Sequence, residues 1–322
     1  MNSKKWLFFI GIILALGTGS MGAWSLSRGL LKPIEAIEKG IDALKTHDQT
    51  FRILETRNDE FGALSQAFNH LLETTGELDA AKMVQESLVP TKLPSLPGYS
   101  LEMRFFRSKA IGGDYVDALF TSSGLFAFLV GDVAGHGVGS ALIMAMAKSV
   151  VFLHFSEGGT PQDLLPRLNM ALCNVSNQKN MMTFSFGILD PKTHEGRIFS
   201  GGNPYPLLWK AQEKVGTFIG APRYPLGLNQ GNSYDEGISF HFHPGDLLFL
   251  YTDGLVEAPD RENQPFGYEM LRQSVQELAP DGPVALCETF QKRIFQRVQC
   301  STLSDDISYL AIQRDRMGMN KE

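Results

Sequence analysis

Residues 125–137 read LFAFLVGDVAGHG, an apolar run of strand-forming residues that ends at Asp132 and a glycine-rich turn. A strand holds the position of a carboxylate, and glycine lets the backbone approach a ligand closely. A long run rich in small and apolar residues follows, from Val138 to Phe155, and predicts a helix. The segment therefore predicts a strand, a carboxylate at its end, and a helix that begins just after it.

An aspartate at the meeting point of an apolar strand and a turn recurs at distant places in the chain. Carboxylates that are gathered from separate segments repel one another unless a cation neutralises them. Oxygen ligands without a nearby His or Cys cluster suit Mg²⁺ or Mn²⁺ rather than zinc. The alternative for any single site is ordinary turn chemistry, which we accept for Asp235 and Asp281. The further sites are Gly112-Gly113-Asp114-Tyr115-Val116-Asp117, Tyr251-Thr252-Asp253-Gly254 and Ser304-Asp305-Asp306-Ile307-Ser308.

From Tyr99 onward, short apolar runs alternate with Gly, Pro and Asp, which is typical of strands and turns. The strands do not alternate regularly with helices, so the pattern predicts an α+β fold with helices over antiparallel sheets. Strands are predicted at 125–130, 182–189, 197–200, 207–210, 238–242, 247–251 and 307–312, and helices at 138–155, 162–175, 268–278 and 284–298.

The composition excludes some classes of protein. The 322 residues are 43% hydrophobic, so disorder throughout the chain is excluded, and the net charge of -6 argues against a nucleic-acid partner. Cys173, Cys287 and Cys300 are odd in number and contain no CxxC pair. We therefore expect neither a disulfide framework nor a zinc cage, which fits a reducing compartment.

The apolar run from Trp6 to Leu26 contains no charged residue and is long enough to cross a bilayer as a helix. The alternative is a cleaved signal peptide, but the run is long for one. Basic residues at Arg28, Lys32 and further on favour a cytoplasmic position for the chain that follows. We therefore expect a single-pass anchor in the inner membrane over residues 1–28, with the rest of the chain in the cytoplasm.

Two amphipathic helices are expected next, and their narrow apolar stripes suit a coiled-coil seam between chains. The pair resembles a HAMP domain over residues 29–77, through Asp59-Glu60-Phe61-Gly62, Pro33 and Asn69. That resemblance implies a four-helix bundle made by a homodimer; an ordinary dimerising hairpin is the alternative. The stripes are Ile34, Ile37, Ile41 and Leu44, then Phe61, Leu64, Phe68 and Leu71, continued by Leu78, Ala81, Gln85 and Leu88 through a connecting helix and linker at 78–98.

Residues 99–315 resemble the SpoIIE-type branch of the PPM metal-dependent serine/threonine phosphatases, and residues 316–322 are expected to form a tail. The resemblance implies a β-sandwich flanked by helices, with two Mn²⁺ or Mg²⁺ ions at one end. It is carried by GGDYVD at 112–117, GDVAGHG at 131–137, PLGL at 225–228, PGDLLFLYTDGLVEA at 244–258, FG at 266–267 and SDDIS at 304–308.

Carried over residue by residue, the resemblance implies metal ligands and catalytic carboxylates at Asp114, Asp132 and Asp253. Asp132 would bridge both ions, the backbone carbonyl of Val133 would help, and Asp305 would complete the set. Asp305 is preferred to Asp306 as the ligand, and Asp117 is expected to lie next to the ligands without binding the metals itself. The implied reaction is hydrolysis of phosphoserine or phosphothreonine by a hydroxide that bridges the two metals.

Other residues near these motifs have open roles. His136 is either a general acid or a residue of a tight turn, and Asn203 stands where many members of the family have His. His241 and His243 would share one strand face, exposed rather than metal-binding. Candidates for binding the phosphate, by nearness in sequence alone, are Arg104, Arg107 and Lys109.

The resemblance implies a membrane-anchored signalling enzyme whose substrate is a phosphorylated regulatory protein, typically an anti-sigma-factor antagonist with a STAS domain. Two other functions remain open. Gly112-Gly113-Asp114 suggests a diguanylate cyclase, but Tyr115 and the residues after it do not continue that motif. A pseudophosphatase acting as a scaffold is the non-enzymatic alternative, and the set of Asp114, Asp132, Asp253 and Asp305 argues against it.

Overall fold

The computed structural model describes residues 3–46, 48, 50–54, 59–176, 181–234, 236–298 and 303–316. The chain divides into two compact units, Met1–Ala81 and Lys82–Glu322. Asp235 and Cys300 lie outside the described residues, as do the side chains of Leu44 and Leu78.

The first unit is helical. It contains α1 (Ser3–Leu26), a short π-helix η1 (Ser27–Leu31), α2 (Lys32–Lys45) and most of α3 (Glu60–Leu88). Asn69 of α3 holds the connector between α2 and α3, because its Nδ2 donates to the carbonyl of Ile53 at 3.0 Å and its Oδ1 accepts from the amide of the same residue at 2.9 Å. One amide side chain thus satisfies both backbone groups of Ile53. Among the side chains of this unit that the structure describes, the buried hydrophobic ones are Ala43, Ile53 and Leu72.

The predicted coiled-coil stripes are only partly covered in the single chain. Ile34 is 53% exposed, Ile41 42%, Leu64 48% and Leu71 49%. These side chains follow the heptad spacing of a coiled-coil seam, whose residues are buried only against a second set of helices. The exposed stripe therefore leaves an apolar helical surface for which the single chain provides no cover among its described residues.

The second unit contains two five-stranded antiparallel sheets. The predicted α+β sandwich is confirmed, and the carboxylate-bearing segments belong to neighbouring strands. The first sheet has the order β1 (Tyr99–Phe106), β10 (Ile307–Arg314), β9 (Leu247–Tyr251), β6 (Leu207–Lys210) and β7 (Val215–Phe218). The second has the order β2 (Tyr115–Phe120), β3 (Phe126–Val133), β4 (Met182–Leu189), β5 (Glu195–Gly201) and β8 (Ile238–His241).

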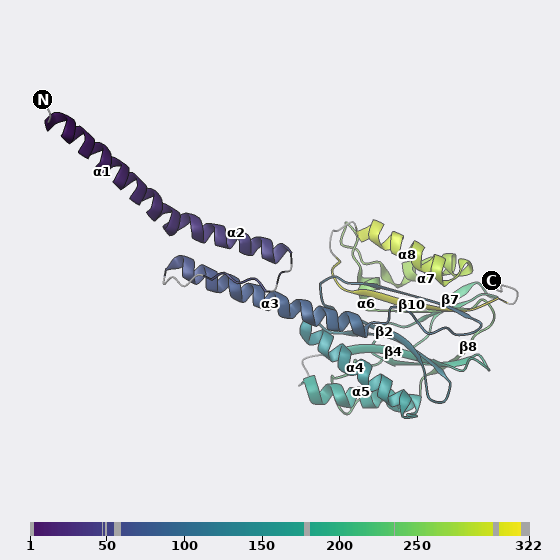
Figure 1. The fold of residues 1–322 in the computed structure, drawn as a ribbon. Helices are drawn as coiled ribbons and strands as arrows, with labels where there is room; N and C mark the ends of the chain where they lie inside the picture. The colour runs from purple at the N-terminus through teal and green to yellow at the C-terminus, as the bar shows by residue number, and fades with distance from the viewer. Residues whose placement is uncertain are drawn as a thin grey trace. The chain divides into compact units, whose positions relative to one another are not determined.

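Helices cover the outer face of each sheet, so the unit has four layers (Figure 1). Figure 1 shows α4 and α5 on one side of the stacked sheets and α7 and α8 on the other. A central core between the sheets includes Phe128, Val130 and Leu250, all fully buried. The helices are α4 (Val138–Ser156), α5 (Pro161–Ser176), α6 (Asp253–Glu257), α7 (Gly267–Leu278), a 3-10 turn η2 (Ala279–Asp281) and α8 (Pro283–Val298).

Among the described residues, α4 is the helix with the length and composition to cross a membrane. Met144, Ala147 and Val151 of this helix are fully buried in the core against the second sheet, so α4 is a core helix of the sandwich. The predicted span Trp6–Leu26 forms the greater part of α1, a single helix of 24 residues. Several side chains of α1 lie outside the described residues, and the apolar ones that are described are exposed.

Candidate metal centre

The aspartates singled out in the sequence come together at one end of the two sheets. Asp132 is the second-last residue of β3, and Asp114 directly precedes β2, the neighbouring strand, whose Tyr115 pairs with Gly131. Asp253 begins α6 directly after β9, and Asp305 lies just before β10, the strand that pairs with β9. Each sheet therefore contributes two carboxylates to the same end of the sandwich.

Direct contacts join the two sheets at this end. The hydroxyl of Thr252, beside Asp253, donates to Oδ2 of Asp114 at 3.2 Å. Gly254 packs so closely on the backbone carbonyl of Asp306 that a Cβ there would overlap it. A Cβ on Gly113 would lie 2.6 Å from the carbonyl oxygen of Val133, so glycine is needed for that carbonyl to approach this loop. The glycines in these motifs thus allow the chain segments to approach one another closely.

The carboxylates are close enough to raise one another's pKa. The pKa of Asp114 lies well above its usual range because the group is buried and because Asp132 is negatively charged. Burial and then Asp253 raise the pKa of Asp132 to about 7. Burial and then Asp305 raise the pKa of Asp253. This concentration of negative charge is unfavourable without a counter-charge.

The donor set fits a divalent cation. Oδ1 of Asp114 is buried and has no hydrogen-bond partner, which is costly for a carboxylate oxygen unless another group uses it. The surrounding donors are oxygen atoms, the kind that Mg²⁺ and Mn²⁺ prefer. Among the described residues, no group of three or more His, Cys, Asp or Glu side chains stands in an arrangement that could hold a metal ion. The raised pKa values and the orphaned oxygen of Asp114 make this cluster the candidate site for a cation.

Asp305 and Asp306 occupy different environments. Asp306 is 5% exposed, and its Oδ1 accepts hydrogen bonds from the amide of Ser108 at 2.8 Å and from the hydroxyl of the same residue at 3.0 Å. Asp305 is exposed, and its Oδ1 accepts the amide of Asp306 at 2.8 Å. Asp306 therefore holds the loop at Ser108, whereas the carboxylate of Asp305 lies at the surface near Asp253.

The remaining residues predicted near the site lie in different surroundings. Asp117 forms an ion pair with Lys148 of α4 at 2.5 Å and accepts the amide of Ala118. His136 is exposed in a turn between two glycines with positive φ. Arg104 pairs with Glu102, Arg107 pairs with Glu86 at 3.0 Å, and Lys109 is exposed.

Sequence reasoning missed the function of Asn203. This side chain is 3% exposed; its Nδ2 donates to the carbonyl of Tyr251 at 3.0 Å, and its Oδ1 accepts from the hydroxyl of Thr183 at 3.1 Å. Thr183 pairs with Asp132 across β4 and β3, and Tyr251 lies two positions before Asp253. Asn203 thus links the two sheets beside their carboxylates. Its place in a family motif was the only signal of this in the sequence.

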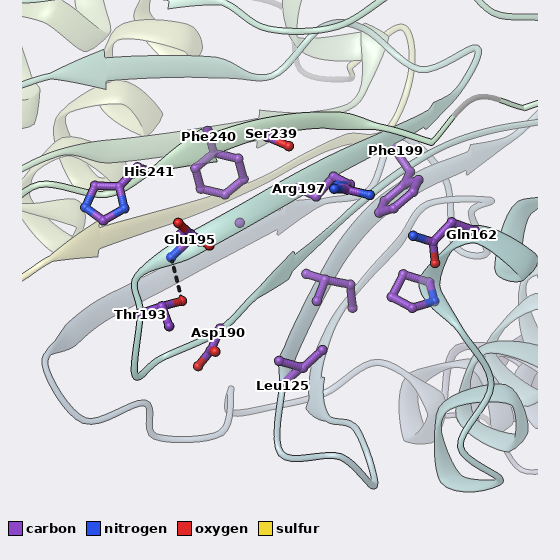
Figure 2. A pocket seen from close by; sticks show the side chains of 13 residues that line it. Leu125, Gln162, Asp190, Thr193, Glu195, Arg197, Phe199, Ser239, Phe240 and His241 are labelled. Atoms are coloured by element: carbon purple, nitrogen blue, oxygen red, sulfur yellow. Dashed lines mark hydrogen bonds between the residues drawn. The ribbon is translucent and has the colours of Figure 1, made fainter.

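Among the cavities on this unit, one adjoins the carboxylates and a larger one does not. The larger, of about 640 Å³, lies beside the start of β5 and includes Glu195, Arg197 and His241 (Figure 2). It is at the far end of the strands from Asp132. His241 is partly buried and His243 exposed, with ring centroids 4.8 Å apart; the strand β8 ends at His241, one residue earlier than predicted.

The smaller cavity, of about 520 Å³, is lined by Asp253 itself and by Glu257 and Tyr268. Burial, followed by the charge of Asp253, raises the pKa of both Glu257 and Tyr268. This cavity is therefore the open space next to the carboxylate cluster.

Comparisons with known proteins agree with the geometry. The family Stage II sporulation protein E (SpoIIE) matches residues 122–315, and the HAMP domain matches residues 25–77. Protein IcfG of Synechocystis sp. is 22% identical over 95% of this chain and 55% of its own length. Phosphoserine phosphatase RsbU of Bacillus subtilis is 22% identical over 75% of this chain and 71% of its own.

A solved structure has the same fold. The crystal structure of the RsbU and RsbW domains of Rv1364c from Mycobacterium tuberculosis matches with a TM-score of 0.60 and 27% identity, over 71% of this chain and 63% of that one. The chain spans little more than half the length of IcfG. The SpoIIE match covers more than half of the chain and includes Asp132, Asp253 and Asp305. The chain therefore belongs to the SpoIIE family of PP2C-type protein serine/threonine phosphatases and carries a HAMP domain ahead of its phosphatase domain.

Proposed function

We propose that this chain is a membrane-anchored protein phosphatase that hydrolyses phosphoserine or phosphothreonine on a regulatory protein. The observation that carries the proposal is the group of carboxylates at one end of the sandwich, with raised pKa values at Asp114, Asp132 and Asp253 and an orphaned oxygen on Asp114. Carboxylates gathered in this way repel one another, and bound cations would neutralise that repulsion and supply the charge that phosphate hydrolysis needs.

The residues that would hold two Mn²⁺ or Mg²⁺ ions are Asp114, Asp132, Asp253 and Asp305, with the carbonyl of Val133. When bound, such a pair of ions lowers the pKa of water and neutralises the oxygens of a phosphoryl group. The preference for Asp305 over Asp306 is supported by the hydrogen bonds that already occupy Asp306.

The chain's own contribution is to keep these carboxylates in position. Thr252 donates a hydrogen bond to Asp114, and Asn203 ties the strand before Asp253 to the strand beside Asp132. A site whose ligands are held by such supporting hydrogen bonds loses little ordering entropy on binding. No cysteine is needed as a nucleophile; Cys287 is buried, and burial raises the pKa of its thiol to about 12.

We infer that the substrate is a phosphorylated partner protein, in keeping with the resemblance to phosphatases that act on anti-sigma-factor antagonists with a STAS domain. The match to phosphoserine phosphatase RsbU supports this substrate class. A diguanylate cyclase is not supported, because the second unit folds as an antiparallel sandwich and residues 122–315 match the SpoIIE family.

Membrane anchoring and dimerisation complete the proposal. Helix α1 would span the inner membrane once, with the HAMP domain and the phosphatase domain in the cytoplasm. The HAMP match and the uncharged run from Trp6 to Leu26 support this placement. The exposed stripe of Ile34, Ile41, Leu64 and Leu71 supports a homodimer, in which a second copy would cover it.

The test uses the full chain in lipid nanodiscs with a phosphoserine peptide. We expect phosphate release with Mn²⁺ or Mg²⁺, loss of release after chelation, and recovery when the metal is restored. Asp132→Asn should abolish release, whereas the matched change Asp190→Asn, at the far end of the same sheet, should not. Activity that survives exhaustive chelation would contradict the metal-dependent mechanism. A folded wild-type protein that binds metal and releases no phosphate would indicate a pseudophosphatase.

A further inference from the structure

The cavity beside Asp253 has aromatic walls. It is formed by segments that are distant in sequence: the loop after β5, the end of β7 and the loop after it, and the helices α6 and α7. Three aromatic side chains, Tyr205, Phe218 and Tyr268, line it. We call this cavity the aromatic cleft.

The walls of the aromatic cleft are held in place by contacts within the domain. Phe218 and Tyr268 form an edge-to-face pair, with ring centroids 5.7 Å apart and planes at 89°. The carbonyl of Tyr205 accepts the hydroxyl of Tyr251 at 2.9 Å, and the ring of Tyr205 packs on Gly220 so closely that a Cβ there would overlap it. These rings therefore form a surface that exists before any ligand arrives, which reduces the ordering cost of binding.

The aromatic cleft is too large for a phosphoryl group alone. Its volume of about 520 Å³ is in the range of a pocket for a small ligand or for one or two side chains. It is continuous with the carboxylate cluster, because Asp253 belongs to both. A substrate whose phosphate lies at the carboxylates would therefore place a neighbouring part of itself in the cleft.

The charge of the aromatic cleft selects what that neighbouring part can be. Among the described residues, the charged side chains that line it are Arg223, Asp253 and Glu257. The guanidinium of Arg223 donates from Nη1 to the carbonyl of Pro222 at 3.2 Å. Since Asp253 is a proposed metal ligand, Glu257 is the carboxylate that would disfavour an acidic side chain there, and an apolar side chain would gain contact with the three rings.

We propose that the aromatic cleft binds an apolar side chain that flanks the phosphorylated serine or threonine of the protein substrate. The proposal rests on the proposed phosphatase function and adds a determinant of which phosphoprotein is chosen. Tyr268, which is 50% exposed, supplies the accessible wall, and Glu257 supplies the discrimination against acidic neighbours.

The test compares two kinds of substrate on the full chain in nanodiscs at saturating Mn²⁺. One is a small aryl phosphate ester, which carries no flanking amino-acid side chain. The other is a series of phosphoserine peptides in which each position flanking the phosphoserine is in turn Leu, Ala or Asp. We expect a flanking position at which Leu gives the highest kcat/KM and Asp the lowest.

Variants then assign that preference to the cleft. Tyr268→Ala should lower kcat/KM for the Leu peptide by about twofold to tenfold, which corresponds to the ~0.5–1.5 kcal/mol that an aromatic contact contributes beyond its buried area. It should leave turnover of the aryl ester and the Mn²⁺ requirement unchanged, and Tyr268→Phe should retain the wild-type preference. Phe152→Ala, which removes an exposed ring from α4, is the matched control and should have no effect.

A charge reversal provides a gain that misfolding cannot imitate. Glu257→Lys should raise kcat/KM for the Asp peptide relative to the Leu peptide. Either of two results would overturn the cleft proposal alone. One is that Tyr268→Ala loses as much activity on the ester as on the peptides. The other is that the wild-type protein hydrolyses the ester but shows no preference among the peptides. If the wild-type protein releases no phosphate from the ester or any peptide, the proposed phosphatase function itself is overturned.

Discussion

The side chain of Gln85, in the last turns of α3, forms hydrogen bonds with both backbone groups of Gly112. Its Nε2 donates to the carbonyl at 2.5 Å, and its Oε1 accepts the amide at 3.4 Å. Gln85 is 2% exposed, and Gly112 lies two positions before Asp114 and packs against the carboxylate of Asp306. The helix that leaves the HAMP domain is therefore bonded directly to the loop that carries a proposed metal ligand.

We predict that Gln85→Ala raises the Mn²⁺ concentration needed for half-maximal activity by about fivefold or more, since an unpaired buried polar group costs ~1–3 kcal/mol. The reason is that the loop at Gly112 loses its two bonds to α3 and no longer holds Asp114 firmly. Metal titration of activity measures this effect. Gln273→Ala, an exposed glutamine of α7, is the control. An unchanged metal requirement would show that the bond to Gly112 is only a packing contact.

We predict that Asn203→Ala lowers both activity and melting temperature. The substitution leaves the carbonyl of Tyr251 and the hydroxyl of Thr183 without their hydrogen-bond partner, which costs ~1–3 kcal/mol of folding stability. Asn203→His, which keeps a donor and an acceptor, should retain more of both properties than the alanine variant. Turnover and thermal melts of the two variants, beside the exposed control Asn174→Ala, check this. Wild-type behaviour of Asn203→Ala would remove the supporting role assigned to this side chain.

The raised pKa of Asp132 predicts a pH dependence for the metal-free protein. Its folded-state pKa of about 7 exceeds the ordinary value of 3.8, so the folded state binds this proton more tightly than the unfolded state does. The contribution of Asp132 to the free energy of unfolding therefore falls as the pH rises from about 4 to about 7. We expect chelated Asp132→Asn to melt above chelated wild type, and by a wider margin at about pH 8 than at about pH 5.

Added Mn²⁺ should reverse that order at neutral pH. A cation that binds only the folded state stabilises it, and the wild type would gain more than the variant because it keeps the carboxylate. Melting of chelated and Mn²⁺-loaded protein, with Asp190→Asn as control, measures both effects. A chelated Asp132→Asn that is less stable than wild type at about pH 8 would contradict the assignment of charge repulsion to this residue.

We predict that Ile41→Glu combined with Leu64→Glu converts the protein from dimer to monomer. These side chains are 42% and 48% exposed in the single chain, so a charge there is tolerated by one copy and is buried only in a coiled-coil seam. Sedimentation of the protein in detergent measures the state. Glu73→Lys, on the exposed surface of α3, is the control. A dimer that persists in the double variant would place the dimer contacts elsewhere.

The predicted coiled-coil seam does not continue unchanged to the end of α3. Leu88, predicted as a coiled-coil position, packs against the outer core of the second sheet, and Gln85 is committed to Gly112. A charge at Leu88 would therefore disturb the phosphatase core as well as any dimer contact. Leu78, another predicted seam position, has a side chain outside those described. Gln85 is thus the better residue for testing the connection between α3 and the site.

Strands rich in apolar and aromatic residues were predictable from the sequence. The strands at Met182–Leu189, Leu207–Lys210 and Leu247–Tyr251 have the predicted bounds, because strand-forming residues predominate in them and Pro, Gly or Asp lies close to their ends. The strands β1, β2 and β7 were missed. In β1, Tyr99–Phe106, polar Ser, Glu and Arg side chains interrupt the apolar ones, and the strand is defined by its pairing with β10. Such pairing is non-local and leaves little trace in a single window.

The sequence by itself determined which residue types could form the site: aspartates at strand ends beside glycines, at positions that match a family pattern. Only the tertiary structure decided which neighbours support them. It separates Asp305 from Asp306, bonds Asn203 to Thr183 and Tyr251, and joins Gln85 to Gly112. The physical reason is that a carboxylate's position depends on its own strand, whereas its hydrogen bonds and its pKa depend on segments that meet it only after the sheets have packed.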